Sequence, residues 1–147
     1  MKKFSFSLEK VLEIRKFRQE QAEIEVGRAL SAEQVIQHKL DTVASQYAET
    51  TQLMRGASDF QLLCDANRFY ALLNMQKEQL LEELTQAKLV TEEKRKILQK
   101  AMREYEAVAK LREKNYAVYE QELAAEEENL VDDIVTSRYN RGRTGSD

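Results

Sequence analysis

The chain has 147 residues and a formal net charge of −3, with 33% of its residues charged and only 7% aromatic. Its abundance of Ala, Glu, Lys, Leu, Gln and Arg is typical of a long helix or coiled coil, and its negative charge argues against a general nucleic-acid binder. No apolar run is long enough for a membrane span or a signal peptide, and the single Cys64 excludes an internal disulfide. We therefore expect a cytoplasmic protein.

A first long helix is predicted over about residues 7–55, because apolar side chains recur there at alternating spacings of three and four. Residues at that spacing share one side of a helix, which is the seam expected of a two-stranded coiled coil. Arg15, Gln19, Glu33 and Thr50 fall in the same register and weaken the seam. The apolar seam residues are Leu8, Leu12, Ala22, Val26, Ala29, Ile36, Leu40, Val43, Tyr47 and Met54.

A second stripe consists of Phe6, Phe17, Ile24 and Val35, which are predicted to lie roughly opposite the seam. A two-helix hairpin would leave this stripe in water. It therefore packs either against another part of the chain, such as the C-terminal helix, or against a partner protein.

A sharp reversal is predicted at about residues 56–58. Gly56 can adopt the left-handed conformation that ends a helix, and Ser58 with Gln61 has the capping-box spacing that begins one.

A second helix is predicted over about residues 59–139, followed by a disordered tail at 140–147. Its seam loosens after about residue 109, and an acidic block runs from Glu120 to Asp133. The seam residues are Leu63, Ala66, Tyr70, Leu73, Leu80, Leu84, Leu98, Ala101, Tyr105 and Val108.

These elements predict an all-α fold, a single domain at 1–139 formed by a long antiparallel two-helix coiled-coil hairpin. Folding at Gly56 would place residue i near residue 114 − i, so that Tyr47 lies beside Asn67 to Tyr70 and Leu40 beside Leu73. The first helix would end near Arg103 to Ala107, and the longer C-terminal helix would overhang or bend back.

No catalytic, cofactor or metal site is predicted. His38 is the only histidine, so a histidine-based metal cluster or nucleophile pair cannot form within the chain. Cys64 has no nearby second cysteine, and the acidic residues around Glu127 and Asp133 are not in a calcium-binding loop. We expect a non-enzymatic protein without cofactors.

Both termini are basic, which suits insertion into a socket with acidic walls or reflects ordinary charge scatter. The residues concerned are Lys2, Lys3, Lys10, Arg15, Lys16 and Arg18 at the start and Arg138, Arg141 and Arg143 at the end.

The N-terminal segment also has a distinctive spacing, Phe4-x-Phe6-x-Leu8-x-x-Val11-Leu12-x-x-Arg15, followed by Glu20 and Ala22. This pattern, the total length, the Tyr47 to Gly56 approach to the turn and the Phe69-Tyr70 with Leu73 after it resemble the FliJ family of flagellar type III export proteins. The resemblance covers most of the chain.

The resemblance implies a soluble stalk or adaptor that binds the hexameric flagellar export ATPase, promotes its ring assembly or activity, and contacts the membrane-embedded export gate and export chaperones. It also implies a location at the cytoplasmic face of the inner membrane without membrane insertion. By this reading the ATPase-facing residues are Phe6, Arg15, Lys16, Phe17, Arg18 and Ile24, and the gate-facing residues near the turn are Leu40, Tyr47, Phe69 and Leu73.

Two alternatives remain at this stage. One is a small cytosolic chaperone or adaptor that holds secreted subunits on exposed apolar stripes. The other is a passive homodimeric spacer, in which self-association buries the outer stripe. We expect a monomer in isolation.

Overall fold

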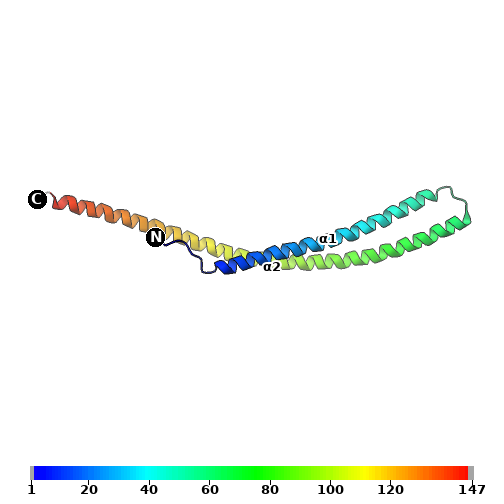
Figure 1. Cartoon of the computed structure of the whole chain (residues 1–147), viewed down its shortest axis with the longest axis horizontal. Helices are drawn as coiled ribbons and strands as arrows, with labels where there is room; N and C mark the ends of the chain where they lie inside the picture. Colours follow the sequence, from blue (N-terminus) through cyan, green and yellow to red (C-terminus); the bar gives the residue numbers. More distant parts are fainter. Residues whose placement is uncertain (1, 146–147) are drawn as a thin grey trace. The chain divides into compact units, whose positions relative to one another are not determined.

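A computed structural model describes residues 2–145 of the protein. It contains two helices, α1 (Glu9–Leu53) and α2 (Phe60–Thr144), which residues 54–59 connect (Figure 1). The described residues contain no β-strand, so the predicted all-α hairpin is confirmed. Across residues 2–145, neither helix has a stretch that is long and apolar enough to cross a membrane.

The helices follow from the absence of proline and from the many residues with high helix propensity. Glu9 in the first turn of α1, and Arg141 and Arg143 in the last turn of α2, also suit the helix dipole. The chain divides into two compact units. Unit 1 comprises residues 1–17 and 102–147, and unit 2 comprises residues 18–101. The predicted single domain therefore stays a prediction.

Unit 2 is an antiparallel helix pair that buries a narrow seam. Thr91 was not among the predicted seam residues, yet it is only 2% exposed, and its hydroxyl donates a hydrogen bond to the carbonyl oxygen of Ala87 at 3.0 Å. Gln19, Glu33 and Thr50, the polar residues predicted in this part of the seam, are all partly buried. The buried side chains of the unit are Ala22, Ala29 and Val43 from α1 and Ala66, Leu73, Thr91 and Ala101 from α2.

The turn contains the predicted left-handed glycine, Gly56, with a φ of 74°. The predicted cap of α2 is wrong by one residue. Asp59, not Ser58, precedes the helix, and its carboxylate accepts a hydrogen bond from the backbone N–H of Gln61 at 3.0 Å. An N-cap side chain bonds the second or third helical N–H in this way.

The predicted pairing of α1 with α2 is displaced by about five residues, which is roughly one and a half helical turns. In unit 2, Glu25 lies 3.7 Å from Lys94. In unit 1, Arg15 bonds Glu104, and Glu9 contacts Arg112 rather than a residue between Arg103 and Ala107. The reason lies in residues 57–59, which have no helical structure. Three extended residues span about 10 Å, as much as six or seven helical residues, so α2 begins past the end of α1.

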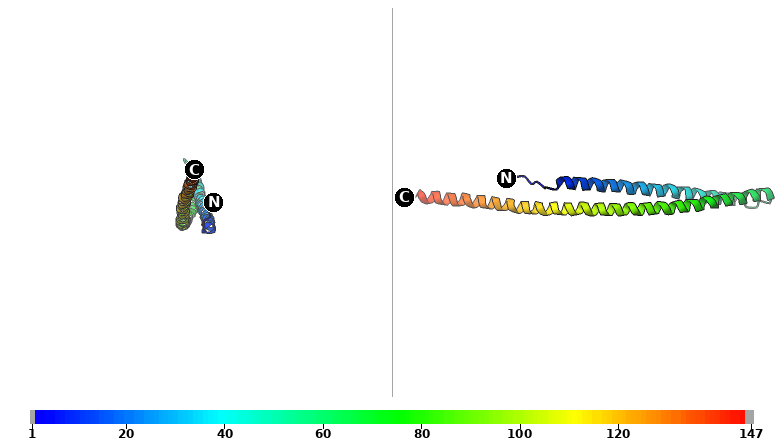
Figure 2. Two further views of the ribbon diagram at one scale, coloured as in Figure 1. Left: turned by 90° about the vertical axis from the view of Figure 1, so that its left-hand side faces the viewer. Right: turned by 90° about the horizontal axis from the view of Figure 1, so that it is seen from below.

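In unit 1, residues 2–8 lie along α2 ahead of the first turn of α1 (Figure 2). We call residues 2–8 the N-terminal strap. Beyond Leu123, every described residue of α2 is exposed, so the predicted overhang is present and does not bend back on itself. The predicted disordered tail differs from the structure, because α2 continues through residues 140–144. Residues 146 and 147 lie outside the described range.

Candidate partner-binding surfaces

The strap is held on α2 by aromatic and polar contacts within unit 1. The ring of Phe4 meets Tyr116 edge-on at 5.1 Å and lies 5.5 Å from the ring of Tyr119. The guanidinium of Arg112 lies over the same Phe4 ring at 5.5 Å, and the hydroxyl of Tyr119 donates to the carbonyl oxygen of Lys2 at 2.8 Å. Together these contacts attach a non-helical segment to one face of α2.

Two of the predicted ATPase-facing residues, Phe6 and Arg15, pack within the chain. Phe6 is only 7% exposed and lies before α1, so its predicted place on the outer stripe is wrong: helical spacing does not apply to a residue outside the helix. Arg15 is partly buried, and its Nη1 donates to the carbonyl oxygen of Glu104 at 2.8 Å. This hydrogen bond gives the guanidinium of Arg15 an acceptor within the seam.

The other four ATPase-facing residues are exposed. In unit 1, Lys16 points to solvent and Phe17 is 59% exposed. In unit 2, Arg18 is exposed and Ile24 is 49% exposed. Val35, the last member of the predicted outer stripe, is 55% exposed. These side chains are therefore accessible to a partner.

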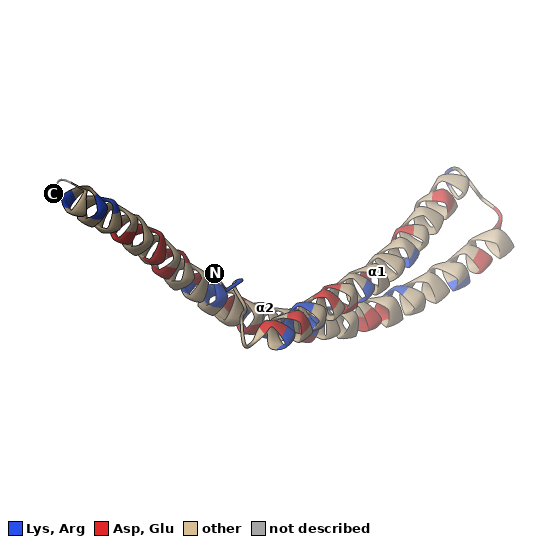
Figure 3. Cartoon of the chain, turned by 60° about the vertical axis from the view of Figure 1, so that its left-hand side comes forward, with Lys and Arg blue, Asp and Glu red and all other residues tan. Residues whose placement is uncertain are grey.

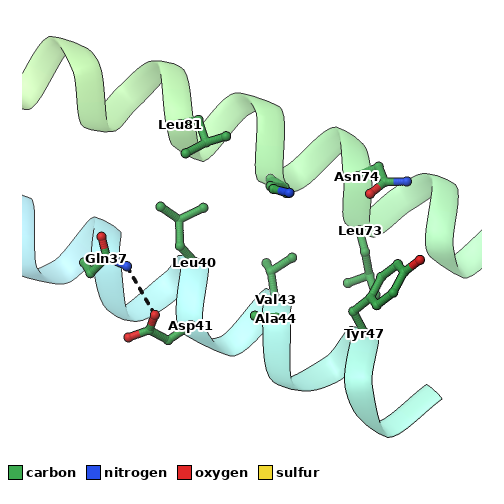
Figure 4. A pocket seen from close by; sticks show the side chains of 10 residues that line it. Gln37, Leu40, Asp41, Val43, Ala44, Tyr47, Leu73, Asn74 and Leu81 are labelled. Carbon is green, nitrogen blue, oxygen red and sulfur yellow. Dashed lines mark hydrogen bonds between the residues drawn. The ribbon is translucent and has the colours of Figure 1, made fainter. Parts of the chain in front are cut away.

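A groove of about 540 Å³ lies between the helices of unit 2. Figure 4 shows Leu40 facing Leu81 across it, whereas the predicted register placed Leu40 beside Leu73. The groove is lined by Gln37, Leu40, Asp41, Val43, Ala44, Tyr47, Leu73, Asn74, Lys77 and Leu81.

The four predicted gate-facing residues differ in accessibility. Leu73 is 2% exposed and is a core residue, and Leu40 is partly buried. Tyr47 is exposed at the groove, and its ring packs on that of Tyr70 at 4.6 Å as predicted. Phe69 is exposed but does not line the groove. The structure thus brings three of the four residues to one groove.

Sequence reasoning missed part of an exposed apolar surface around the turn. Leu53 and Phe60, which flank the connection, are 76% and 79% exposed. The sequence feature that could have identified Leu53 and Phe60 is an apolar residue that lies at the end of a helix and outside the seam register. Three further apolar residues near the start of α2, Leu62, Leu72 and Met75, are also exposed.

Residues 2–145 contain no cluster of three or more His, Cys, Asp or Glu side chains that could hold a metal ion. His38 is exposed on α1, and Cys64 is a partly buried free thiol on α2.

These features define an all-α coiled-coil protein whose accessible surfaces suit the binding of other proteins. The sequence model of the family described as the flagellar FliJ protein matches residues 4–144, so the chain belongs to the FliJ family. The family is a non-catalytic component of the flagellar protein export apparatus, and it interacts with other components of that apparatus. No match was found among curated proteins or among solved structures.

Proposed function

We propose that this protein is a coiled-coil stalk and adaptor of the flagellar export apparatus. It binds the hexameric export ATPase, promotes the assembly or activity of the ATPase ring, and links the ring to the export gate and to export chaperones. The observation that carries the proposal is membership of the FliJ family over residues 4–144. The protein would then work at the cytoplasmic face of the inner membrane.

Support for ATPase binding comes from the start of α1. Lys16 and Phe17 are adjacent and exposed, and Lys16 forms no ion pair with any residue between 2 and 145. An unpaired cation beside an exposed aromatic ring suits an acidic, partly apolar socket. Arg15 contributes less to this surface because its guanidinium is engaged with Glu104.

Support for a gate-binding surface comes from the part of unit 2 around the turn. Tyr47 and Phe69 are exposed there, together with Leu53, Phe60 and Met75. Exposed apolar side chains gathered at one end of an element mark an interaction surface more often than a solvated one. Export chaperones would use the same kind of apolar contact.

The test is ATP hydrolysis and ring formation by the export ATPase, measured with and without this protein. We expect wild-type protein to raise both, and Lys16→Glu with Phe17→Ala to lower the apparent affinity for the ATPase by about tenfold or more. The matched control is Lys88→Glu with Leu89→Ala, an exposed lysine next to an exposed apolar residue on α2, which should behave as wild type.

Equal loss in both variants would contradict binding at the start of α1, since it would indicate a general charge effect. No stimulation by the wild-type protein, together with a monomer in sedimentation, would favour the chaperone role. No stimulation together with a tight dimer would leave the passive spacer.

A further inference from the structure

The C-terminal part of α2 carries an apolar stripe that no described residue covers beyond Leu123. In unit 1, Tyr116 and Tyr119 lie under the strap and Leu123 is partly buried. Leu130 and Ile134 continue the stripe and are 61% and 47% exposed. At about 100° per residue, Leu123, Leu130 and Ile134 lie within about 40° of one another around the helix. The apolar seam residues of α2 in unit 1 therefore continue beyond the point where the N-terminal strap ends.

Carboxylates border this stripe on both sides. Helical spacing places Glu122, Glu126 and Asp133 on one side and Glu120 and Glu127 on the other, each within about 100° of its centre. Residues 120–133 contain no Lys or Arg, and Figure 3 shows this acidic stretch of α2 followed by arginines towards its C-terminal end. Charges at these flanking positions select the partner in a coiled coil.

The strap contacts this face through the ring of Phe4 and the backbone of Lys2. It is basic and aromatic, with Lys2, Lys3 and Phe4, and it occupies the same stripe immediately before the exposed part. A hollow of about 440 Å³ lies at its end, lined by Lys2, Tyr119, Glu122, Leu123 and Glu126. Lys2 therefore lines the same hollow as Glu122 and Glu126, the first carboxylates on one side of the stripe.

A second copy of the chain matches the charges beside the stripe less well than a basic helix does. If two such stripes paired in antiparallel fashion around Leu130, Glu127 of each would face Asp133 of the other, whereas Arg138 of each would face Glu122 of the other. Like charges placed across an interface oppose association.

We propose that residues 120–139 of α2 form a docking surface for a basic amphipathic helix of another protein. The helix packs apolar residues on Leu123, Leu130 and Ile134 and directs lysines or arginines at the flanking carboxylates. The bound helix lies beyond the strap, on the same side of α2. This inference does not depend on the ATPase-binding role, because it involves other residues and another chemistry.

The experiment uses the full chain and a fluorescein-labelled designed peptide of three heptads, with Leu at positions a and d and Lys at positions e and g. Binding is followed by fluorescence anisotropy. We expect the Lys peptide to bind at least about tenfold more tightly than a peptide with Glu at e and g, and more tightly than the same residues in scrambled order. Salt should weaken the binding.

The variant Leu130→Ala with Ile134→Ala should weaken binding of the Lys peptide by about tenfold or more. Alanine preserves helix propensity, so circular dichroism should be unchanged. The control is Leu89→Ala with Ile97→Ala, a second Leu and Ile on α2 that are 56% and 55% exposed, and it should bind as wild type.

Equal binding of the Lys and Glu peptides, or equal loss in the two variant pairs, would overturn the proposal. So would a dimer of the chain alone that dissociates in the Leu130 and Ile134 variant, since the occupant would then be a second copy. The ATPase assay is read separately, so failure here leaves the proposed function intact, and the reverse also holds.

Discussion

Single polar side chains determine how the helices of this hairpin begin and pack. Asp59 accepts the N–H of Gln61 and so provides one of the partners that the first turn of α2 lacks. Arg15 and Thr91 sit at seam positions and remain compatible with burial because each donates to a backbone carbonyl oxygen. Polar groups are tolerated in this seam where such a partner exists.

The cap of α2 gives a prediction at this scale. Asp59→Ala should lower the free energy of unfolding by about 1 kcal/mol, because it removes the N-cap acceptor. Ser58→Ala should change it by less than about 0.5 kcal/mol. Urea unfolding followed by circular dichroism measures both, and a larger effect at Ser58 than at Asp59 would mean that the serine caps the helix in solution.

The sequence allows the seam to be predicted but not which residue caps a helix. The spacing of seven from Leu84 to Thr91 and from Thr91 to Leu98 does contain the buried threonine, although an apolar criterion overlooks it. Ser58 and Asp59 are both good caps, and choosing between them requires the backbone conformation of the turn. Lys16 is exposed, whereas Arg15 is bonded to the backbone of α2. This difference depends on where the neighbouring helix lies, which sequence spacing alone does not determine.

At the scale of the elements, two glycines have opposite roles. Gly27 lies within α1 and an added Cβ would meet nothing within 4 Å, whereas Gly56 has the φ of 74° that closes the turn. Gly27→Ala should therefore stabilise the protein by about 0.5–1 kcal/mol, because alanine loses less backbone entropy in a helix. Gly56→Ala should destabilise it by about 1–2 kcal/mol, because a Cβ is strained at positive φ.

Thermal and urea unfolding of the two variants, monitored at one protein concentration, give the two signs. Gly56→Asn is the control for the turn, since asparagine tolerates the left-handed conformation better than alanine and should recover part of the loss. The same sign at both glycines would indicate that the turn does not retain its left-handed residue in solution.

Element type was predictable along this chain, whereas element ends and pairing were not. A heptad pattern specifies a helix over tens of residues, but the three extended residues before α2 displace the partner register by about five positions. Gly and Ser near the C-terminus indicated a disordered tail, yet Arg141 and Arg143 belong to α2. Phe6 was assigned to a helix face because its spacing from Phe17 fits the helical period, although it precedes both the predicted helix and α1.

At the scale of the whole molecule, burial is distributed unevenly along the chain. Unit 2 contains the most buried side chains, Leu73 and Thr91. In unit 1, α2 beyond Leu123 has only exposed side chains in the described range. An isolated helix of about twenty residues is marginal in water, so local opening should cost little there and much more at the seam.

Hydrogen exchange of the free protein should reveal this gradient. Backbone amides of residues 124–144 should exchange at least about a hundredfold faster than those near Leu73, because the former open without breaking apolar contacts. Binding of the lysine-rich designed peptide should slow exchange at residues 124–139 and leave the amides near Leu73 unchanged. If the free protein already protected residues 124–144 as strongly as its seam, the stripe would be covered. Exchange at several dilutions would then show whether a second copy covers it, because that protection would fall with concentration.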